Sequence, residues 1–497
     1  MKKRIRITAL LLAAAMILTG CGNENTSSAT DSGSSATSSA GTDSKEESSV
    51  TDSKEESSEA ESKEESSDAE SSDEQTESKE ESSVPETSET VTDAPETSAP
   101  ETSQTESKEE NSVVETKPVN PDDTPDADPV YSAMIDRSLM ELGNLQRMKA
   151  FFEKLEKGEE VTVAFIGGSI TEGMTAGASL CWAKLTYNAL CEQYPNAKIN
   201  YVNAGMSGTP SILGNIRAGR DVLCHKPDLT FVEFAVNDGM EQEYKDSYEA
   251  LVRTLLEQEG SPAVALYFTV IKSGHTCEKH MSEIGRAYGL PMVSLNNVLS
   301  VEFSEGRMTW EDYSDDESHP NVWGHEMTKD LIMNMMNKAK AKIAEGGIGD
   351  IEAIPEKWVN NDRFYGMKFF DDANPVEGFT MIDTGSFSGE KDTIQQFPNG
   401  WGAMIAPPDA APMKFTFEGK TLMLLYKCVK SKRGASLRVI VDGKQTGEYS
   451  TQANDAWNNP VAVQVFTGDE GVHEVTIELV DIDGKLVTAE ILGFGIC

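Results

Sequence analysis

Residues 161–173 read Val-Thr-Val-Ala-Phe-Ile-Gly-Gly-Ser-Ile-Thr-Glu-Gly, and they decide the fold of the central part of the chain. The first six residues form an apolar, β-rich run, which is typical of a strand that helices cover on both faces. The two glycines permit a tight turn, which places Ser169 at the carboxyl edge of the sheet, where open α/β folds have their sites. Taken alone, the motif is equally typical of a helix N-cap or a phosphate-binding loop.

The sequence around this stretch predicts an α/β domain over residues 131–350. Short apolar runs alternate with helical patterns, which indicates βαβ units and a parallel sheet. One helix carries an apolar stripe from Tyr248 to Leu256, and the last runs from about Val322 to Ala344. The five predicted strands are Val161–Ile166, Ile199–Asn203, Leu229–Phe234, Ala263–Thr269 and Met292–Leu295.

After Asp350 the helical periodicity ends, and residues 351–497 predict an all-β sandwich. Short alternating segments are separated by turn signals such as Asp442-Gly443 and Asp483-Gly484. The predicted strands are Lys414–Phe417, Leu422–Tyr426, Ser436–Val441, Val461–Phe466 and Val472–Leu479. Four aromatic residues could form a platform for stacking sugars in a carbohydrate-binding domain, although core packing is favoured for each singly: Trp401, Tyr426, Tyr449 and Trp457.

Three further motifs follow predicted strands or precede the last helix. Asn203-Ala-Gly-Met-Ser-Gly208 follows the second strand, Ala235-Val-Asn-Asp238 follows the third, and Asp316-Glu-Ser-His-Pro320 comes before the last helix. Together with the motif around Ser169, they resemble the four blocks of the SGNH (GDSL-type) serine hydrolase superfamily over roughly residues 160–345. The resemblance implies a flavodoxin-like, doubly wound sheet of five parallel strands.

The resemblance also implies catalytic roles. Ser169 would be the nucleophile, His319 the general base and Asp316 the carboxylate that orients the imidazole. The oxyanion donors would be the backbone N–H groups of Ser169 and Gly205 and the side-chain amide of Asn237.

Two positions differ from the commonest form of the family, and two other carboxylates compete with Asp316. Many members have Asp at the position of Gly168 and Gly at the position of Ala235. Asp312 and Asp315 are the alternative orienting carboxylates, but the spacing of three residues to His319 favours Asp316.

Neither a cofactor nor a metal ion is expected. His275, Cys277 and His280 could be drawn as metal ligands, but the segment lacks a fourth partner. His325 is interpreted as structural. The cysteines after residue 21 form no Cys-x-x-Cys pair, and we expect mostly buried free thiols at Cys181, Cys191, Cys224, Cys277, Cys428 and Cys497.

The N-terminal sequence predicts an exported lipoprotein. Basic residues precede the apolar run Ile7–Leu18, and Leu18-Thr-Gly-Cys21 resembles a bacterial lipobox, which implies signal cleavage after residue 20 and lipid attachment to Cys21. Residues 21–130 read as a disordered acidic linker rich in Ser, Glu, Thr and Pro. We therefore expect a lipid-anchored protein on the extracellular face of the bacterial membrane.

These observations favour an exported serine esterase that removes acetyl or other small acyl groups from polysaccharide. The formal net charge of −41 argues against nucleic-acid binding, because an acidic chain repels phosphate. An SGNH-type acyltransferase acting on sugars is the first alternative, and a non-catalytic glycan-binding lipoprotein is the second.

Overall fold

The computed structural model describes residues 129–388, 394–480 and 485–497. The proposed signal peptide, Cys21 and the linker up to residue 128 lie outside these ranges. Helix α1 (Pro129–Arg137) includes residues 129 and 130, which the predicted linker also covers. In the ranges that the structure describes, no helix has the length and apolar character needed to cross a membrane.

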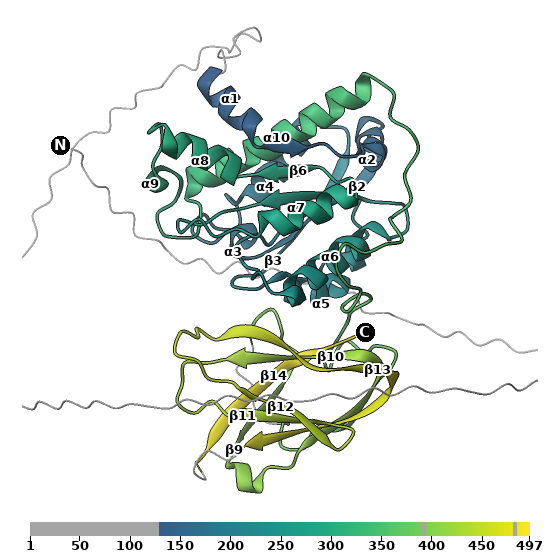
Figure 1. Ribbon diagram of the computed structural model, residues 1–497, viewed down its shortest axis with the longest axis vertical. Coiled ribbons are helices and arrows are strands. Elements are labelled where there is room, and N and C mark those ends of the chain that lie inside the picture. The colour runs from purple at the N-terminus through teal and green to yellow at the C-terminus, as the bar shows by residue number, and fades with distance from the viewer. Residues whose placement is uncertain (1–128, 389–393, 481–484) are drawn as a thin grey trace, which may run out of the picture. The chain divides into compact units, whose positions relative to one another are not determined.

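The first sheet has six strands in the order β1-β6-β5-β4-β2-β3 (Figure 1). The five parallel strands, β2 to β6, are the predicted ones, and the short β1 pairs antiparallel with β6. Because β2 lies between β3 and β4, the winding of the chain reverses there, and open α/β folds have their sites at the carboxyl ends of the strands at such a point. The strands are β1 Leu139–Glu141, β2 Glu160–Gly167, β3 Lys198–Gly205, β4 Leu229–Glu233, β5 Ala263–Phe268 and β6 Met292–Ser294.

Helices cover both faces of this sheet, as the alternation within β2 shows. Val163 and Phe165 pack in one core with α2, α4 and α10, whereas Ala164 and Ile166 pack in another with α5, α6 and α7. The helices are α2 Gln146–Glu156, α3 Ser169–Glu172, α4 Trp182–Gln193, α5 Ser211–Asp221, α6 Gln242–Leu256, α7 Glu278–Ala287, α8 Asn296–Ser304, α9 Trp310–Tyr313 and α10 Val322–Ala344.

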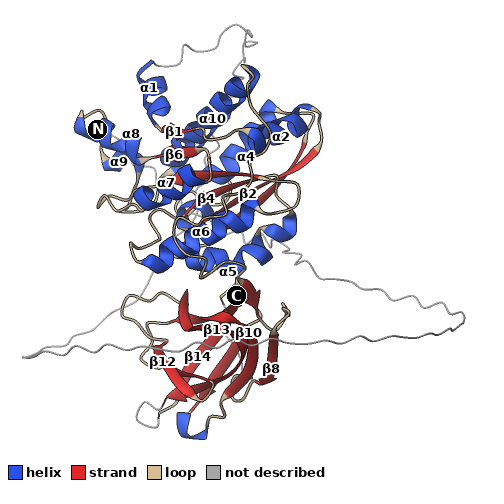
Figure 2. Cartoon of the chain, turned by 45° about the vertical axis from the view of Figure 1, so that its right-hand side comes forward, coloured by secondary structure: helices blue, strands red, loops and turns tan. Residues whose placement is uncertain are grey.

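The strands of the C-terminal part that the structure describes pair antiparallel, and hydrogen bonds join them into one branched sheet around a common core (Figure 2). Strand β10 spans the first two predicted strands of this part, and β13 spans the last two. Trp401 and Tyr426 are buried in the core, Tyr449 is half-buried, and Trp457 is exposed. The strands are β7 Lys368–Phe370, β8 Phe379–Asp383, β9 Trp401–Ile405, β10 Met413–Cys428, β11 Ser436–Val441, β12 Lys444–Ser450, β13 Asn459–Val480 and β14 Val487–Ile496.

The second half of β10 is buried on both faces. Leu422 and Leu424 face the core of the antiparallel sheet, whereas Met423 and Leu425 face the other way. These two side chains belong to a cluster with Ile212, Leu213 and Ile216 of α5. Helix α5 and the antiparallel sheet therefore share a hydrophobic interface.

The segment between α10 and β7 is also tied to the α/β part. Glu249 of α6 is fully buried and accepts hydrogen bonds from the N–H groups of Val359 and Asn360, both at 2.7 Å. Hydrogen bonds to a charged acceptor are the stronger kind, so this connection is firmly held.

Candidate active site

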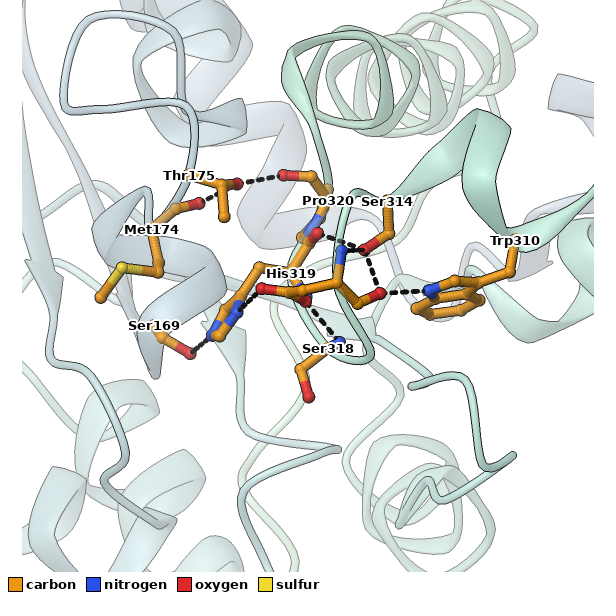
Figure 3. Close-up of polar contacts among 9 residues, drawn as sticks. Ser169, Met174, Thr175, Trp310, Ser314, Ser318, His319 and Pro320 are labelled. Atoms are coloured by element: carbon orange, nitrogen blue, oxygen red, sulfur yellow. Dashed lines mark hydrogen bonds and ion pairs between the residues drawn. The ribbon is translucent and has the colours of Figure 1, made fainter. Parts of the chain in front are cut away.

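Ser169 is the first residue of α3, directly after the end of β2. Its side chain is nearly buried, and its Oγ lies 2.9 Å from Nε2 of His319 (Figure 3). The two glycines before it are required by packing. A Cβ on Gly167 would overlap the hydroxyl of Thr171, and a Cβ on Gly168 would overlap the side-chain amide of Asn237. The absence of Asp at position 168 therefore has a steric reason in this chain.

His319 and Asp316 complete a hydrogen-bonded chain with Ser169. Nδ1 of His319 lies 2.8 Å from Oδ2 of Asp316, and Oδ1 of Asp316 accepts the N–H groups of Ser318 and His319, both at 2.6 Å. Burial alone would raise the pKa of Asp316, but the hydrogen bonds from His319 and Ser318 outweigh it and lower the pKa. The carboxylate therefore stays ionised and holds the imidazole with Nε2 toward the serine.

Asp312, an alternative carboxylate for orienting the imidazole, has a structural role. Its Oδ2 accepts the N–H of Thr309 at 2.8 Å, and together these residues form a capping box for α9. The structure thus pairs the imidazole with Asp316.

The loop that carries Asp316 and His319 is held by two residues that the sequence analysis did not identify. Nε1 of Trp310 donates to the carbonyl oxygen of Asp316, and Oγ of Ser314 lies 2.6 Å from the carbonyl oxygen of His319 (Figure 3). Nothing in the local sequence distinguishes these residues, because their partners are backbone atoms.

The expected oxyanion donors are only partly available. The N–H of Ser169 has no hydrogen-bond partner in the described part of the chain. The side-chain Oδ1 of Asn237 is buried beside Gly168. Its Nδ2 is not buried and makes no hydrogen bond within the described residues. These two groups fit the predicted role.

Gly205 does not fit that role as the structure stands. Its N–H donates to Oδ1 of Asn203 at 2.9 Å, and a Cβ would overlap the backbone of Glu172, so this glycine serves close packing against α3. Gly208 has a φ of 66°, and its N–H has no hydrogen-bond partner among the residues described. Glu172 accepts the N–H of Ser207 at 2.7 Å and so holds this loop against α3. Gly208 is therefore the other candidate for the second backbone donor.

A buried arginine also supports the site. Arg217 of α5 is fully buried and donates to the carbonyl oxygens of Ala204, at 2.7 Å, and Gly167, at 3.2 Å. It thereby joins the carboxyl ends of β3 and β2. An arginine among the apolar residues of one helix was the available sequence signal, but its partners could not be foreseen.

The other polar residues considered earlier lie in structural positions. His275 and Cys277 contact the carbonyl oxygen of Asp238, and His280 is buried on α7. Among the residues that the structure describes, no cluster of three or more His, Cys, Asp or Glu side chains could hold a metal ion. His325 is fully buried and accepts the N–H of Trp182 at 3.2 Å, and all six described cysteines are free thiols.

This arrangement suits acyl transfer through serine. The imidazole can take the proton of the Ser169 hydroxyl as the oxygen attacks an acyl carbon, and Asp316 stabilises the imidazolium that forms. Donors fixed at the end of β4 and the start of α3 can stabilise the developing oxyanion.

Comparisons with known proteins relate the chain to esterases. Residues 165–327 match the GDSL-like Lipase/Acylhydrolase family. An acetylxylan esterase from Geobacillus stearothermophilus is 25% identical over 207 residues, which are 35% of this chain and 91% of that protein.

Two crystal structures match both sheets. A two-domain esterase (CEX) active on acetylated mannans, co-crystallized with mannopentaose, shows 25% sequence identity and a TM-score of 0.63, over 73% of this chain and 98% of that chain. A second structure of a two-domain esterase (CEX) active on acetylated mannans shows 24% identity and a TM-score of 0.64 over the same shares. The protein is thus an esterase, and its α/β part belongs to the GDSL-like lipase/acylhydrolase (SGNH) family.

Proposed function

We propose that this esterase removes acetyl or other small acyl groups from a polysaccharide. Oγ of Ser169 attacks the acyl carbon while its proton passes to Nε2 of His319, and the same proton then leaves with the sugar hydroxyl. Water, activated by His319, cleaves the acyl-serine ester and releases the acid. The hydrogen-bonded chain from Ser169 to Asp316 supports the chemistry.

The position of Trp457 is the observation that supports a polysaccharide substrate. This residue precedes β13, its side chain is 56% exposed, and a Cβ on Gly208 would lie only 2.7 Å from its Cζ2. Gly208 follows Ser207, which is bonded to Glu172 on the same short helix as Ser169. An exposed indole beside the Gly208 loop, which Glu172 ties to the helix that begins with Ser169, offers a flat apolar surface with a polar edge, which suits the face of a sugar ring.

The two relatives named above act on acetylated xylan and acetylated mannans, and they support the same substrate class. Acetylated glucomannan, galactomannan and xylan are therefore the substrates to compare.

Acetate release from these glycans tests the proposal. We expect release by the wild-type protein and none above background by Ser169→Ala. Trp457→Ala should lose about tenfold more kcat/KM on polysaccharide than on a small chromogenic acetate ester, since tenfold corresponds to about 1.4 kcal/mol of lost contact. Activity on small esters alone, with no acetate from any glycan, would overturn the polysaccharide assignment. Including a free sugar acceptor distinguishes hydrolysis from acyl transfer.

We further propose that the enzyme is exported and anchored by lipid at Cys21. The basic N-terminus, the apolar run Ile7–Leu18 and the sequence Leu18-Thr-Gly-Cys21 support this. Cys21→Ser should leave an uncleaved precursor or release the protein from the membrane fraction. A processed, membrane-bound Cys21→Ser protein would contradict lipidation at this residue.

A further inference from the structure

A second carboxylate lies beneath the nucleophile, and neither the triad nor the oxyanion donors account for it. Glu233 is the last residue of β4 and is fully buried. Its Oε2 accepts the hydroxyl of Thr171 at 2.8 Å, and its Oε1 accepts the hydroxyl of Thr269 at 2.7 Å. The backbone N–H of Gly168 also donates to it.

These contacts enclose the turn that carries Ser169. Gly168 precedes the nucleophile by one residue, and Thr171 follows it by two, so one carboxylate holds the chain on both sides of Ser169. Gly167 leaves the room for this contact, because a Cβ there would lie 2.9 Å from Oε2 of Glu233 and would overlap the hydroxyl of Thr171.

The partners of Glu233 suit an anion. Two hydroxyls and one N–H converge on it, and an ionised carboxylate can accept all three, whereas a glutamine would direct its NH₂ group at one of these donors. Burial raises the pKa of Glu233, while the hydrogen bonds from Thr269, Thr171 and Gly168 and the nearby His319 favour its charged form. A buried carboxylate requires such compensation.

The titratable groups around Glu233 come from several elements. They are Asp238 after β4, Tyr248 on α6, Tyr267 on β5, Tyr313 on α9 and His319 on the loop before α10.

We propose that Glu233 is a positioning residue of this esterase: its buried carboxyl group fixes the turn that carries Ser169 through Gly168 and Thr171. The proposal deepens the proposed function, because it rests on Ser169 acting as the nucleophile.

Glu233→Gln tests the proposal, with Glu249→Gln as the matched control. Both glutamates are fully buried, but Glu249 bonds Tyr288 and the segment at residues 359–360. The measurements are kcat and KM on a small soluble acetate ester from pH 5 to 9, together with Tm.

For Glu233→Gln we expect kcat to fall about tenfold or more with little change in KM. Glu249→Gln should lower Tm and leave kcat and KM of the folded protein near those of the wild type. A kcat for Glu233→Gln within twofold of wild type, or an equal loss of kcat in Glu249→Gln, would overturn the proposal.

If Glu233→Gln does not fold, two threonine variants test the proposal instead. Thr171→Val removes the hydroxyl that ties the carboxylate to α3, whereas Thr269→Val removes an equivalent hydroxyl on the side away from Ser169. We expect a clearly larger loss of kcat in Thr171→Val. Equal losses would overturn the role in positioning Ser169. If the wild-type protein itself shows no Ser169-dependent turnover, the failure belongs to the proposed function and not to Glu233.

Discussion

Asn237 and Asn215 show how the same side chain serves chemistry at one position and structure at another. Asn237 presents an unpaired Nδ2 at the carboxyl end of β4, whereas Asn215 is buried on α5 and donates to the carbonyl oxygen of Phe364 at 2.9 Å. We predict that Asn237→Ala lowers kcat on a small ester about a hundredfold to a thousandfold with little change in Tm, because an oxyanion donor is lost.

Asn215→Ala is the control for that prediction. It should lower Tm, since the carbonyl oxygen of Phe364 loses its partner, and leave kcat of the folded protein near that of wild type. A kcat for Asn237→Ala within threefold of wild type would remove this amide from the oxyanion site. Steady-state kinetics and thermal unfolding on the same samples measure both effects.

Some residues of the site could be predicted from the sequence, and others could not. Ser169, Asp316 and His319 were predicted because their motifs follow in a fixed order, and the structure brings them together. Glu233 and Arg217 were missed, because the contacts that give each its role are to partners distant in sequence. The role of the N–H of Gly205 depended on the conformation of Asn203, which spacing cannot give.

At the level of elements, α10 is joined to α4 by a histidine that must stay neutral. Burial of His325 lowers its pKa to about 4, and its Nδ1 accepts the N–H of Trp182. The folded-state pKa lies below the unfolded value of 6.5, so the unfolded chain binds more protons between these values and stability falls as the pH drops through this window.

We predict from this shift that His325 contributes about 2 kcal/mol to the loss of stability between pH 7 and pH 5. His325→Asn retains an acceptor for Trp182 but does not titrate, so its unfolding free energy should fall less over this interval. Urea unfolding at both pH values measures the difference. An identical loss in the variant and the wild-type protein would show that His325 does not carry this pH dependence.

The elements differed in how well their pattern predicted them. The parallel strands were found because burial on both faces gives continuous apolar runs, and α10 was found at its observed bounds. In the antiparallel part, Lys414–Phe417 and Leu422–Tyr426 were predicted as two strands, yet β10 runs through both because Gly419 between them pairs with Gly471 of β13 at a register shift. The short β1 was missed, since three half-buried residues give no periodicity.

At the scale of the whole molecule, the interface at α5 determines what a truncation would do. Removal of residues 351–497 would expose Ile212, Leu213 and Ile216, which are now buried against Met423 and Leu425. Each large apolar side chain loses roughly 1.5–3 kcal/mol on full exposure. We predict that the truncated protein melts lower and loses turnover on small esters and polysaccharide together.

Calorimetry and kinetics on the truncated and full-length proteins measure this outcome. A truncated protein with the melting temperature of the full chain and unchanged turnover on a small ester would mean that the interface contributes little. A selective loss on polysaccharide, with turnover on the small ester retained, would assign the β part to substrate binding alone.

The burial of β10 on both of its faces also limits how such enzymes can be recombined. A strand that serves two cores at once cannot be exchanged as a cassette, because Met423 and Leu425 must match the side chains of α5 while Leu422 and Leu424 match their own sheet. A chimaera that joins this α/β part to the β domain of a relative would need the donor's α5 as well. A crossover placed only in the segment that connects the two sheets would therefore leave α5 without matching side chains in the new β domain.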